Sequence, residues 1–175
     1  MGHMPTVPRR VVTGHDAQGN SVFAQDGEPP IARMAPDGAY FFELWNTGAV
    51  PAPIAPAEPD PTERDLTVPP APGGTKIRIN EFPPGVVSPT HRTQTVDYGI
   101  VLEGEVVLVL DHEEARVLKA GDVVVQRGTD HRWENRTDSV ARMAFILVDG
   151  AFTEELIELI GADGVADLLH DPMHP

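Results

Sequence analysis

Short runs of β-branched and other apolar residues recur from residue 75 to about residue 149, and turn-forming residues separate them. Glu103-Gly104 and Ala120-Gly121-Asp122 are two such turns. Regularly spaced short strands without any helical period are typical of an antiparallel sandwich or barrel. The predicted strands span residues 75–82, 96–102, 105–110, 115–118, 123–126, 131–135 and 140–148.

The stretch before the barrel has a different pattern. Short β-prone pieces at 7–12, 21–24 and 40–45 are separated by Gly and Asp turn residues. The piece at 40–45 is rich in aromatic residues, and we expect a strand that packs against the barrel or against a partner subunit. Residues 49–74 are rich in proline, which removes backbone donors and fixes φ, so they predict an extended linker. This linker could run along the surface or form one wall of a pocket.

Helix-forming residues follow the barrel. Thr153 can cap a helix predicted over 153–169, Gly161 and Gly164 are expected to break it into two pieces, and Pro172 ends it. At the other end of the chain, the first four residues are interpreted as an expression remnant.

The chain therefore divides into four parts. Residues 1–4 are set aside, 5–74 hold N-terminal strands and the proline-rich linker, 75–150 form the barrel, and 151–175 form a helical tail.

Composition excludes several functions. The formal net charge of −14 repels phosphate backbones, and no cluster of Lys and Arg opposes it, so we expect no nucleic-acid partner. The absence of cysteine excludes disulfides, thiolate catalysis and cysteine-based zinc sites. No apolar run approaches the roughly 20 residues that span a bilayer, so no membrane association is expected. No signal peptide is visible, and a cytoplasmic location is expected by default.

Two histidine-containing motifs lie within the predicted barrel region. The second, which ends at Asn135, places His131 and Trp133 on one face of a late strand. In the first, the side chains that share parity would project from an extended strand into one space: His91, Thr93, Thr95 and Asp97.

The first motif resembles that of the cupin superfamily, which runs from a glycine through His-x-His and a glutamate to a second glycine. Gly85, His91 and Gly104 keep this frame. Thr93 stands at the position of the second histidine, and Asp97 stands at the position of the glutamate.

The second motif is also similar to its cupin counterpart, in which glycine, Pro-x-Gly, histidine and asparagine follow one another. Gly121, Gly128, His131 and Asn135 reproduce the pattern, with Gln126 at the position of the proline. Two matched motifs about 30 residues apart identify the fold far better than either motif alone.

This resemblance, which covers residues 75–148, implies an all-β double-stranded β-helix, or jelly-roll, barrel. The barrel would carry an N-terminal strand extension and a short C-terminal helix. By the same resemblance His91, Asp97 and His131 match three of the four usual metal ligands, and two imidazoles with one carboxylate suit Fe, Mn, Ni or Zn. The metal position that the second histidine fills in the family would be taken by water, or the hydroxyl of Thr93 would bind the metal weakly or form a hydrogen bond to a metal-bound ligand.

The same residues also permit a pocket without metal. Asp97 reaches about one methylene less far than glutamate, and many cupins have lost their metal. In that interpretation His91 and His131 are hydrogen-bonded lining residues. The sequence leaves both interpretations open.

The substrate-binding residues expected from parity line the same space. Trp133 lies on the face of the second histidine, and alternate residues of the last strand complete an apolar lining. The predicted substrate-binding set is Thr93, Thr95, Trp133, Met143 and Phe145.

Three arginines lie close to the motifs. Arg92 and Arg132 have the opposite parity from the histidines and are expected to form surface salt bridges. Arg127 precedes Gly128 and could hold a substrate carboxylate at the barrel mouth.

The leading hypothesis is a metal-dependent enzyme acting on a small organic acid or carbonyl compound, either a decarboxylase- or dehydratase-type lyase or a non-haem dioxygenase. The alternative is a non-catalytic, metal-free module that binds a small molecule. A metal-free sugar isomerase would need a tyrosine acid, but Tyr98 has the wrong parity. We also expect a homodimer that packs through its N-terminal strands.

Overall fold

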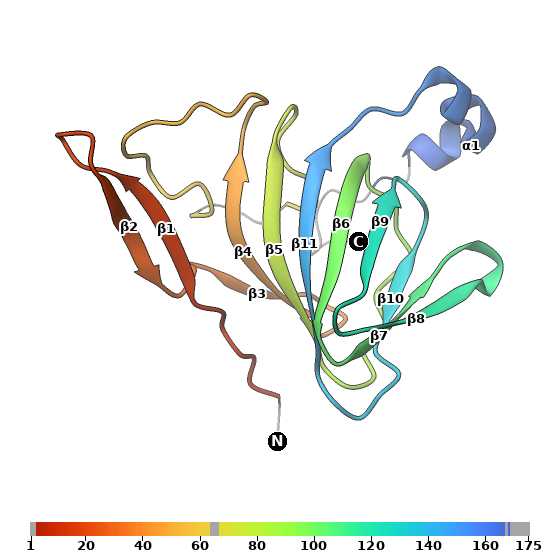
Figure 1. Cartoon of the computed structure of the whole chain (residues 1–175). Helices are drawn as coiled ribbons and strands as arrows, with labels where there is room; N and C mark the ends of the chain where they lie inside the picture. Colours follow the sequence, from red (N-terminus) through yellow and green to blue (C-terminus); the bar gives the residue numbers. More distant parts are fainter. Residues whose placement is uncertain (1–2, 64–66, 167, 169–175) are drawn as a thin grey trace.

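The structure is a computed structural model that describes residues 3–63, 67–166 and 168, and it is built of strands with one C-terminal helix (Figure 1). The all-β prediction is confirmed. The strands are β1 (Arg10–His15), β2 (Ser21–Gly27), β3 (Ala32–Met34), β4 (Tyr40–Thr47), β5 (Thr75–Phe82), β6 (Thr95–Glu103), β7 (Glu105–Val109), β8 (Ala115–Lys119), β9 (Val123–Arg127), β10 (Arg132–Glu134) and β11 (Ala141–Asp149). The helix α1 spans Glu154–Ala166, and a 3₁₀ turn covers Asp111–Glu113.

These strands form two antiparallel sheets and a separate hairpin. The larger sheet has the order β3-β4-β5-β11-β6-β9, and the smaller one has the order β10-β7-β8. In Figure 1 the smaller sheet lies beside the β6–β9 edge of the larger one, while the β1–β2 hairpin stands apart at the opposite side. The first motif runs into β6, which pairs with β9 in the larger sheet, whereas β10, which carries the end of the second motif, belongs to the smaller sheet, so the two histidine motifs come to face one space.

The predicted N-terminal strands are more closely integrated than expected. The predicted strand at 40–45 is β4, which pairs with β5 and so belongs to the same sheet as the barrel strands. The predicted strand at 7–12 lies further along the chain, at Arg10–His15, and the short strand β3 was not predicted. The aromatic residues of β4 are used inside the chain, since Phe42 is fully buried and Phe41 packs against the core.

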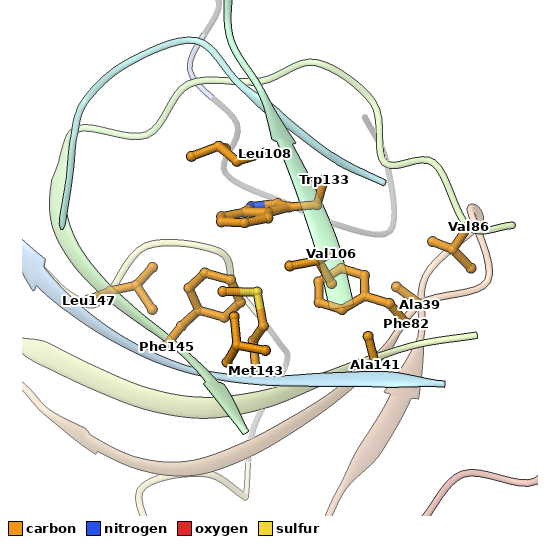
Figure 2. Packing of buried hydrophobic residues seen from close by; sticks show 11 residues of the cluster. Ala39, Phe82, Val86, Val106, Leu108, Trp133, Ala141, Met143, Phe145 and Leu147 are labelled. Atoms are coloured by element: carbon orange, nitrogen blue, oxygen red, sulfur yellow. The ribbon is translucent and has the colours of Figure 1, made fainter. Parts of the chain in front are cut away.

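An apolar core fills one part of the space between the sheets (Figure 2). Met143 and Phe145 project from β11 toward Val106 of β7, and Trp133 of β10 lies across them. The rings of Trp133 and Phe145 meet edge to face, with centroids 5.4 Å apart. Truncating such a side chain to alanine costs about 3–5 kcal/mol, so this cluster holds the neighbouring pocket in a fixed shape.

Strand β5 buries its polar face. Lys76, Arg78 and Asn80 are buried on the face that ends in Phe82, whereas Ile77 and Ile79 are only half-buried on the opposite face, where Glu81 is the buried residue. The register places the three polar residues opposite Leu147, Phe145 and Met143, whose side chains point into the core. Two cations and an amide therefore enter the barrel interior beside its apolar residues.

Glycine is required where the first motif ends. Gly104 joins β6 to β7 with φ of 72°, and a Cβ there would lie 2.6 Å from the carbonyl oxygen of Val140. Both constraints favour glycine, and the turn that they permit sends the chain from one sheet to the other.

The C-terminal helix is capped as predicted. The N–H of Leu156 donates to Oγ1 of Thr153 at 3.3 Å, and Gly161, with φ of 73°, kinks the helix. The second predicted break, at Gly164, is wrong, because this residue lies within α1. The predicted helix end at residue 169 and Pro172 lie outside the described residues. Among the described helices none is long and apolar enough to cross a membrane.

Candidate functional site

A cavity of about 70 Å³ lies between the sheets, next to the apolar core. Both histidine motifs line it, and so do segments that precede the barrel. Its apolar walls are Phe41, Val68, Phe82, Trp133, Phe145 and Leu147. Its polar lining includes Arg78, Asn80, Thr93, Asp97 and Gln126 together with His91 and His131. A space of this size holds several waters or a small organic molecule.

The two predicted histidines are direct neighbours. The N–H of His91 donates to the carbonyl oxygen of His131 at 2.9 Å, and the reciprocal bond measures 3.0 Å. Their ring centroids lie 4.2 Å apart. The two motifs are therefore joined at their histidines, which are 40 positions apart in the chain, by a pair of backbone hydrogen bonds.

Each imidazole is held in one tautomer. Nδ1 of His91 lies 2.9 Å from the carbonyl oxygen of Pro89, and Nδ1 of His131 lies 3.0 Å from that of Thr129. A carbonyl only accepts, so each Nδ1 carries the proton and each Nε2 keeps its lone pair. Burial lowers the pKa of His91, and burial together with His91 lowers the pKa of His131 to about 3. Both rings are neutral near pH 7.

Asp97 enters the same cavity from β6. It is buried, and its Oδ1 has no hydrogen-bond partner among the described residues. Burial raises the pKa of its carboxyl group, while the Thr95 hydroxyl and the charge of Arg78 oppose that rise. Asp97 is thus the acidic group of the cavity interior, and a cation stands near it.

The predicted metal ligands share the cavity but do not form a closed set. Within residues 3–63, 67–166 and 168 the structure brings together no group of three His, Cys, Asp or Glu side chains that could hold a metal ion. The histidine pair does have the arrangement of metal-binding histidines, with Nδ1–H donated to a carbonyl and Nε2 free. The residues present therefore fit two metal ligands, His91 and His131, and leave Asp97 apart.

Three of the five predicted substrate-binding residues line the cavity: Thr93, Trp133 and Phe145. Thr95 does not, although it shares the parity of Asp97 on β6; its hydroxyl donates to Thr93 at 2.8 Å, and the residue lines a hollow near the start of α1. Met143 does not line it either, because its side chain is fully buried in the apolar core. Whether the other three contact a substrate stays a prediction.

Sequence reasoning missed Arg78, which contributes the cavity's fixed positive charge. It comes from the polar face of β5 and is 6% exposed. Desolvation lowers its pKa to about 10, against the charges of Asp97 and Glu43, so it is a cation near neutral pH. The available signal was the alternation on β5, where Arg78 shares parity with Phe82 and not with Ile77.

The cavity also has two walls that lie before the barrel in sequence. Val68, from the proline-rich segment, is 2% exposed and lines the cavity, so at least this part of the segment forms a pocket wall. The turn between β3 and β4 contributes Ala35 and Asp37. Gly and Asp residues predicted a turn before the strand at 40–45, but no local pattern placed it at the cavity, because its position depends on the pairing of β4 with β5.

The arginines near the motifs differ from expectation in two cases. Arg92 is buried, with an ion pair to Asp130 at 2.7 Å, because the C-terminal helix packs over it. Arg127 is exposed and lies outside the cavity, beside a shallow hollow near the start of α1. Arg132 forms the expected ion pairs, with Glu113 and Glu134.

Comparison with known proteins agrees with this architecture. The sequence profile of the family described as Cupin domain matches residues 78–148. The chain is 39% identical over 174 residues to Phomopsin biosynthesis cluster protein C' of Diaporthe leptostromiformis, a match that covers 96% of this chain and 91% of that protein.

Two further matches bear on family and fold. The cupin-domain-containing oxidoreductase virC of Hypocrea virens is 36% identical over 146 residues, covering 80% of this chain and 75% of that protein. A solved structure, the Cupin 2 conserved barrel domain protein from Salinispora arenicola, matches with a TM-score of 0.50 and 23% identity over 74% of this chain and 91% of that one. The second match supports the fold alone.

Proposed function

The chain belongs to the cupin family, and from this premise we propose that it is an enzyme acting on a small organic acid or carbonyl compound inside the cavity. The observation that carries the proposal is the histidine pair. Both rings are held neutral, and the lone pair of each Nε2 is available at a cavity where several other buried polar atoms, on Asn80, Asp97 and Gln126, lack hydrogen-bond partners among the described residues. Buried polar groups without partners are rare in proteins and mark sites that bind something.

We further propose that His91 and His131 hold a divalent transition metal, Fe, Mn, Ni or Zn. Asp97, the carboxylate of the predicted set, lines the same cavity. Such a metal would polarise a carbonyl or carboxylate oxygen, or provide a site for dioxygen. Several relatives are named cupin-domain-containing oxidoreductases. Of the two predicted reaction types, these names favour the non-haem dioxygenase over the lyase.

The chain's own side chains would perform the remaining tasks. The apolar walls, Phe41, Trp133 and Phe145 among them, exclude bulk water from the cavity. Asp97 can hold a proton at a higher pH than an ordinary carboxyl group, since its pKa is raised. Asp97 is therefore a side chain of the cavity that can donate a proton to a bound ligand.

Metal analysis of the purified protein tests the metal proposal. We expect close to one equivalent of a transition metal in the wild type and a loss of at least tenfold in both His91→Ala and His131→Ala. His112→Ala is the matched control, because His112 lies in the exposed 3₁₀ turn between β7 and β8. Absence of metal in the wild type after reconstitution with all four metals would contradict the proposal.

The alternative, a non-catalytic module that binds a small molecule without metal, rests on the incomplete ligand set. It predicts ligand binding that is unaffected by metal and no oxygen consumption or carbon dioxide release with any bound acid. The same metal analysis therefore separates the two functions.

We also propose a homodimer and a cytoplasmic location. The outward positions of β6 and β9 are apolar and exposed at Tyr98, Leu102, Val123 and Val125. The outward side chains from Val96 to Leu102 and from Val123 to Arg127 include no carboxylate, although the chain has a net charge of −14. Two copies can approach across this face without like-charge repulsion. Light scattering at micromolar concentration tests the dimer.

A further inference from the structure

We infer that the cavity binds its ligand through a carboxylate, or an equivalent oxyanion, and that Arg78 selects for that group. The ligand would be a small organic acid whose apolar part packs against the aromatic walls. This inference deepens the proposed function, on which it rests for the existence of a small-molecule ligand. It does not depend on a metal.

The first step is the poor hydrogen bonding of Arg78. A guanidinium has five N–H donors. Among the described residues Arg78 makes one hydrogen bond, from Nη1 to the carbonyl oxygen of Val68 at 3.5 Å, and its buried Nε has no partner. Its other contact is with the face of the Phe41 ring, whose centroid lies 5.1 Å from Cζ. A buried cation left in this condition costs free energy that a bound anion would recover.

The second step is the absence of a carboxylate that neutralises Arg78. No carboxylate oxygen of a described residue lies within 4.0 Å of its nitrogens. Glu43 contacts Lys76 instead, and Asp97 influences Arg78 only at longer range. Asp37, which also lines the cavity, accepts the N–H of Ala39. The described side chains thus leave a positive charge in the cavity without a close counter-ion.

The third step is the set of unpaired polar atoms around Arg78. Oδ1 of Asn80, Oδ1 of Asp97 and both amide atoms of Gln126 are buried without a hydrogen-bond partner among the described residues. Asn80 shares a strand with Arg78, while Asp97 and Gln126 are paired on β6 and β9. A carboxylate can accept hydrogen bonds from the guanidinium and from the Gln126 amide at once. Water can accept the same bonds, but it does not neutralise the charge of Arg78. A protonated or hydroxylated ligand can also donate to the free oxygens.

The fourth step concerns the shape of the ligand. Phe41, Trp133 and Phe145 present aromatic surface to the cavity. A planar guanidinium stacked on Phe41 binds a planar carboxylate through two parallel hydrogen bonds. A small acid with a flat apolar body therefore matches both halves of the lining, whereas a neutral ligand would leave Arg78 without a counter-ion.

Binding of matched acids and amides tests the inference. Isothermal titration calorimetry would compare benzoate with benzamide and acetate with acetamide, because each amide has the shape of its acid without the charge. We expect the wild type to bind at least one acid tenfold or more tightly than its amide. In Arg78→Met that ratio should fall below threefold, and in Arg78→Lys it should be intermediate.

Arg127→Met is the matched control, since it removes an exposed arginine that lies outside the cavity. It should keep the wild-type ratio. Circular dichroism and the melting temperature would establish that each variant is folded. If Arg78→Met does not fold, the ratio of acid to amide affinity is measured in Arg78→Lys instead. The inference is overturned if Arg78→Met keeps the acid preference, or if neither acid binds the wild type at millimolar concentration.

His91→Ala and His131→Ala separate this inference from the metal proposal. If Arg78 binds the anion, both variants keep the acid preference even when their metal is lost. If the preference disappears in the histidine variants and survives in Arg78→Met, the metal site binds the carboxylate and the role assigned to Arg78 is wrong. A metal-free wild type that still prefers benzoate to benzamide would refute the metal proposal alone.

Discussion

Lys76 and Arg78 are two buried cations at successive inward positions of β5, and their surroundings differ. Nζ of Lys76 donates to the carbonyl oxygen and the hydroxyl of Thr67, at 2.5 and 3.0 Å, and lies 3.4 Å from Glu43. Arg78, two residues further along the strand, has one long hydrogen bond and faces the cavity. The same strand therefore carries a cation whose donors are used within the chain and a cation whose donors are largely unused.

The difference follows from what covers each position. The proline-rich segment passes over Lys76 and supplies Thr67, while β4 supplies Glu43. Near Arg78 the same segment contributes the carbonyl oxygen of Val68, and the remaining space around the guanidinium is the cavity. The buried charge of Lys76 therefore serves the fold, and that of Arg78 is a candidate for ligand binding. Replacing each cation in turn tests these two roles separately.

The largest effect is expected for Lys76→Met. The substitution leaves Glu43 buried beside a methionine, and breaking a buried ion pair from one side costs about 3–5 kcal/mol. Urea unfolding followed by circular dichroism measures the loss. Lys119→Met is the matched control, because its pair with Glu105 is exposed and should cost under about 1 kcal/mol. Equal losses in the two variants would show that the interior pair has no special role.

A third cation, Arg10, tests whether pairing alone explains the contrast. Its side chain forms a largely buried ion pair with Asp60 and so ties the β1–β2 hairpin to the proline-rich segment. Burial would raise the pKa of Asp60, but hydrogen bonds from Arg10 and Thr62 outweigh it and lower that pKa to about 2.

A carboxyl group with a lowered folded-state pKa stabilises the fold above its unfolded pKa of about 4, and the contribution is lost as the pH falls toward 2. Asp60→Asn should therefore be less stable than the wild type by about 1–2 kcal/mol at pH 6. The gap should close as urea unfolding is repeated down to pH 2. A gap that is independent of pH would mean that the amide disturbs packing and not charge.

The sequence predicted most of the barrel because its strands are local patterns. The seven strands expected between residues 75 and 149 all form, with ends shifted by about one residue, since β-branched runs and turn residues act at short range. The meeting of the two histidines was expected from the resemblance of their motifs to those of the cupin superfamily. What failed depended on segments that meet only in the folded chain.

Three residues illustrate those failures. Arg92 is buried because α1 packs over it, which no feature near Arg92 reveals. Thr95 lies outside the cavity although Thr93 and Asp97, which share its parity, line it; it borders instead a hollow formed with the segment that begins α1, which is distant in sequence. Arg78 was overlooked because β5 carries isoleucines on one face and polar residues on the other, and a sheet with an apolar outer face reverses the usual assignment of inside and outside.

The smallest effect on stability is expected for Arg78→Met, although it is the substitution that should abolish acid binding. It removes one long hydrogen bond and a contact with Phe41, and it relieves the desolvation of a poorly paired cation. We therefore expect the free energy of unfolding to change by no more than about 1 kcal/mol in either direction. A loss as large as that of Lys76→Met would make Arg78 a structural residue. Added benzoate should raise the wild-type melting temperature and leave that of Arg78→Met unchanged, because a ligand stabilises only the state that binds it.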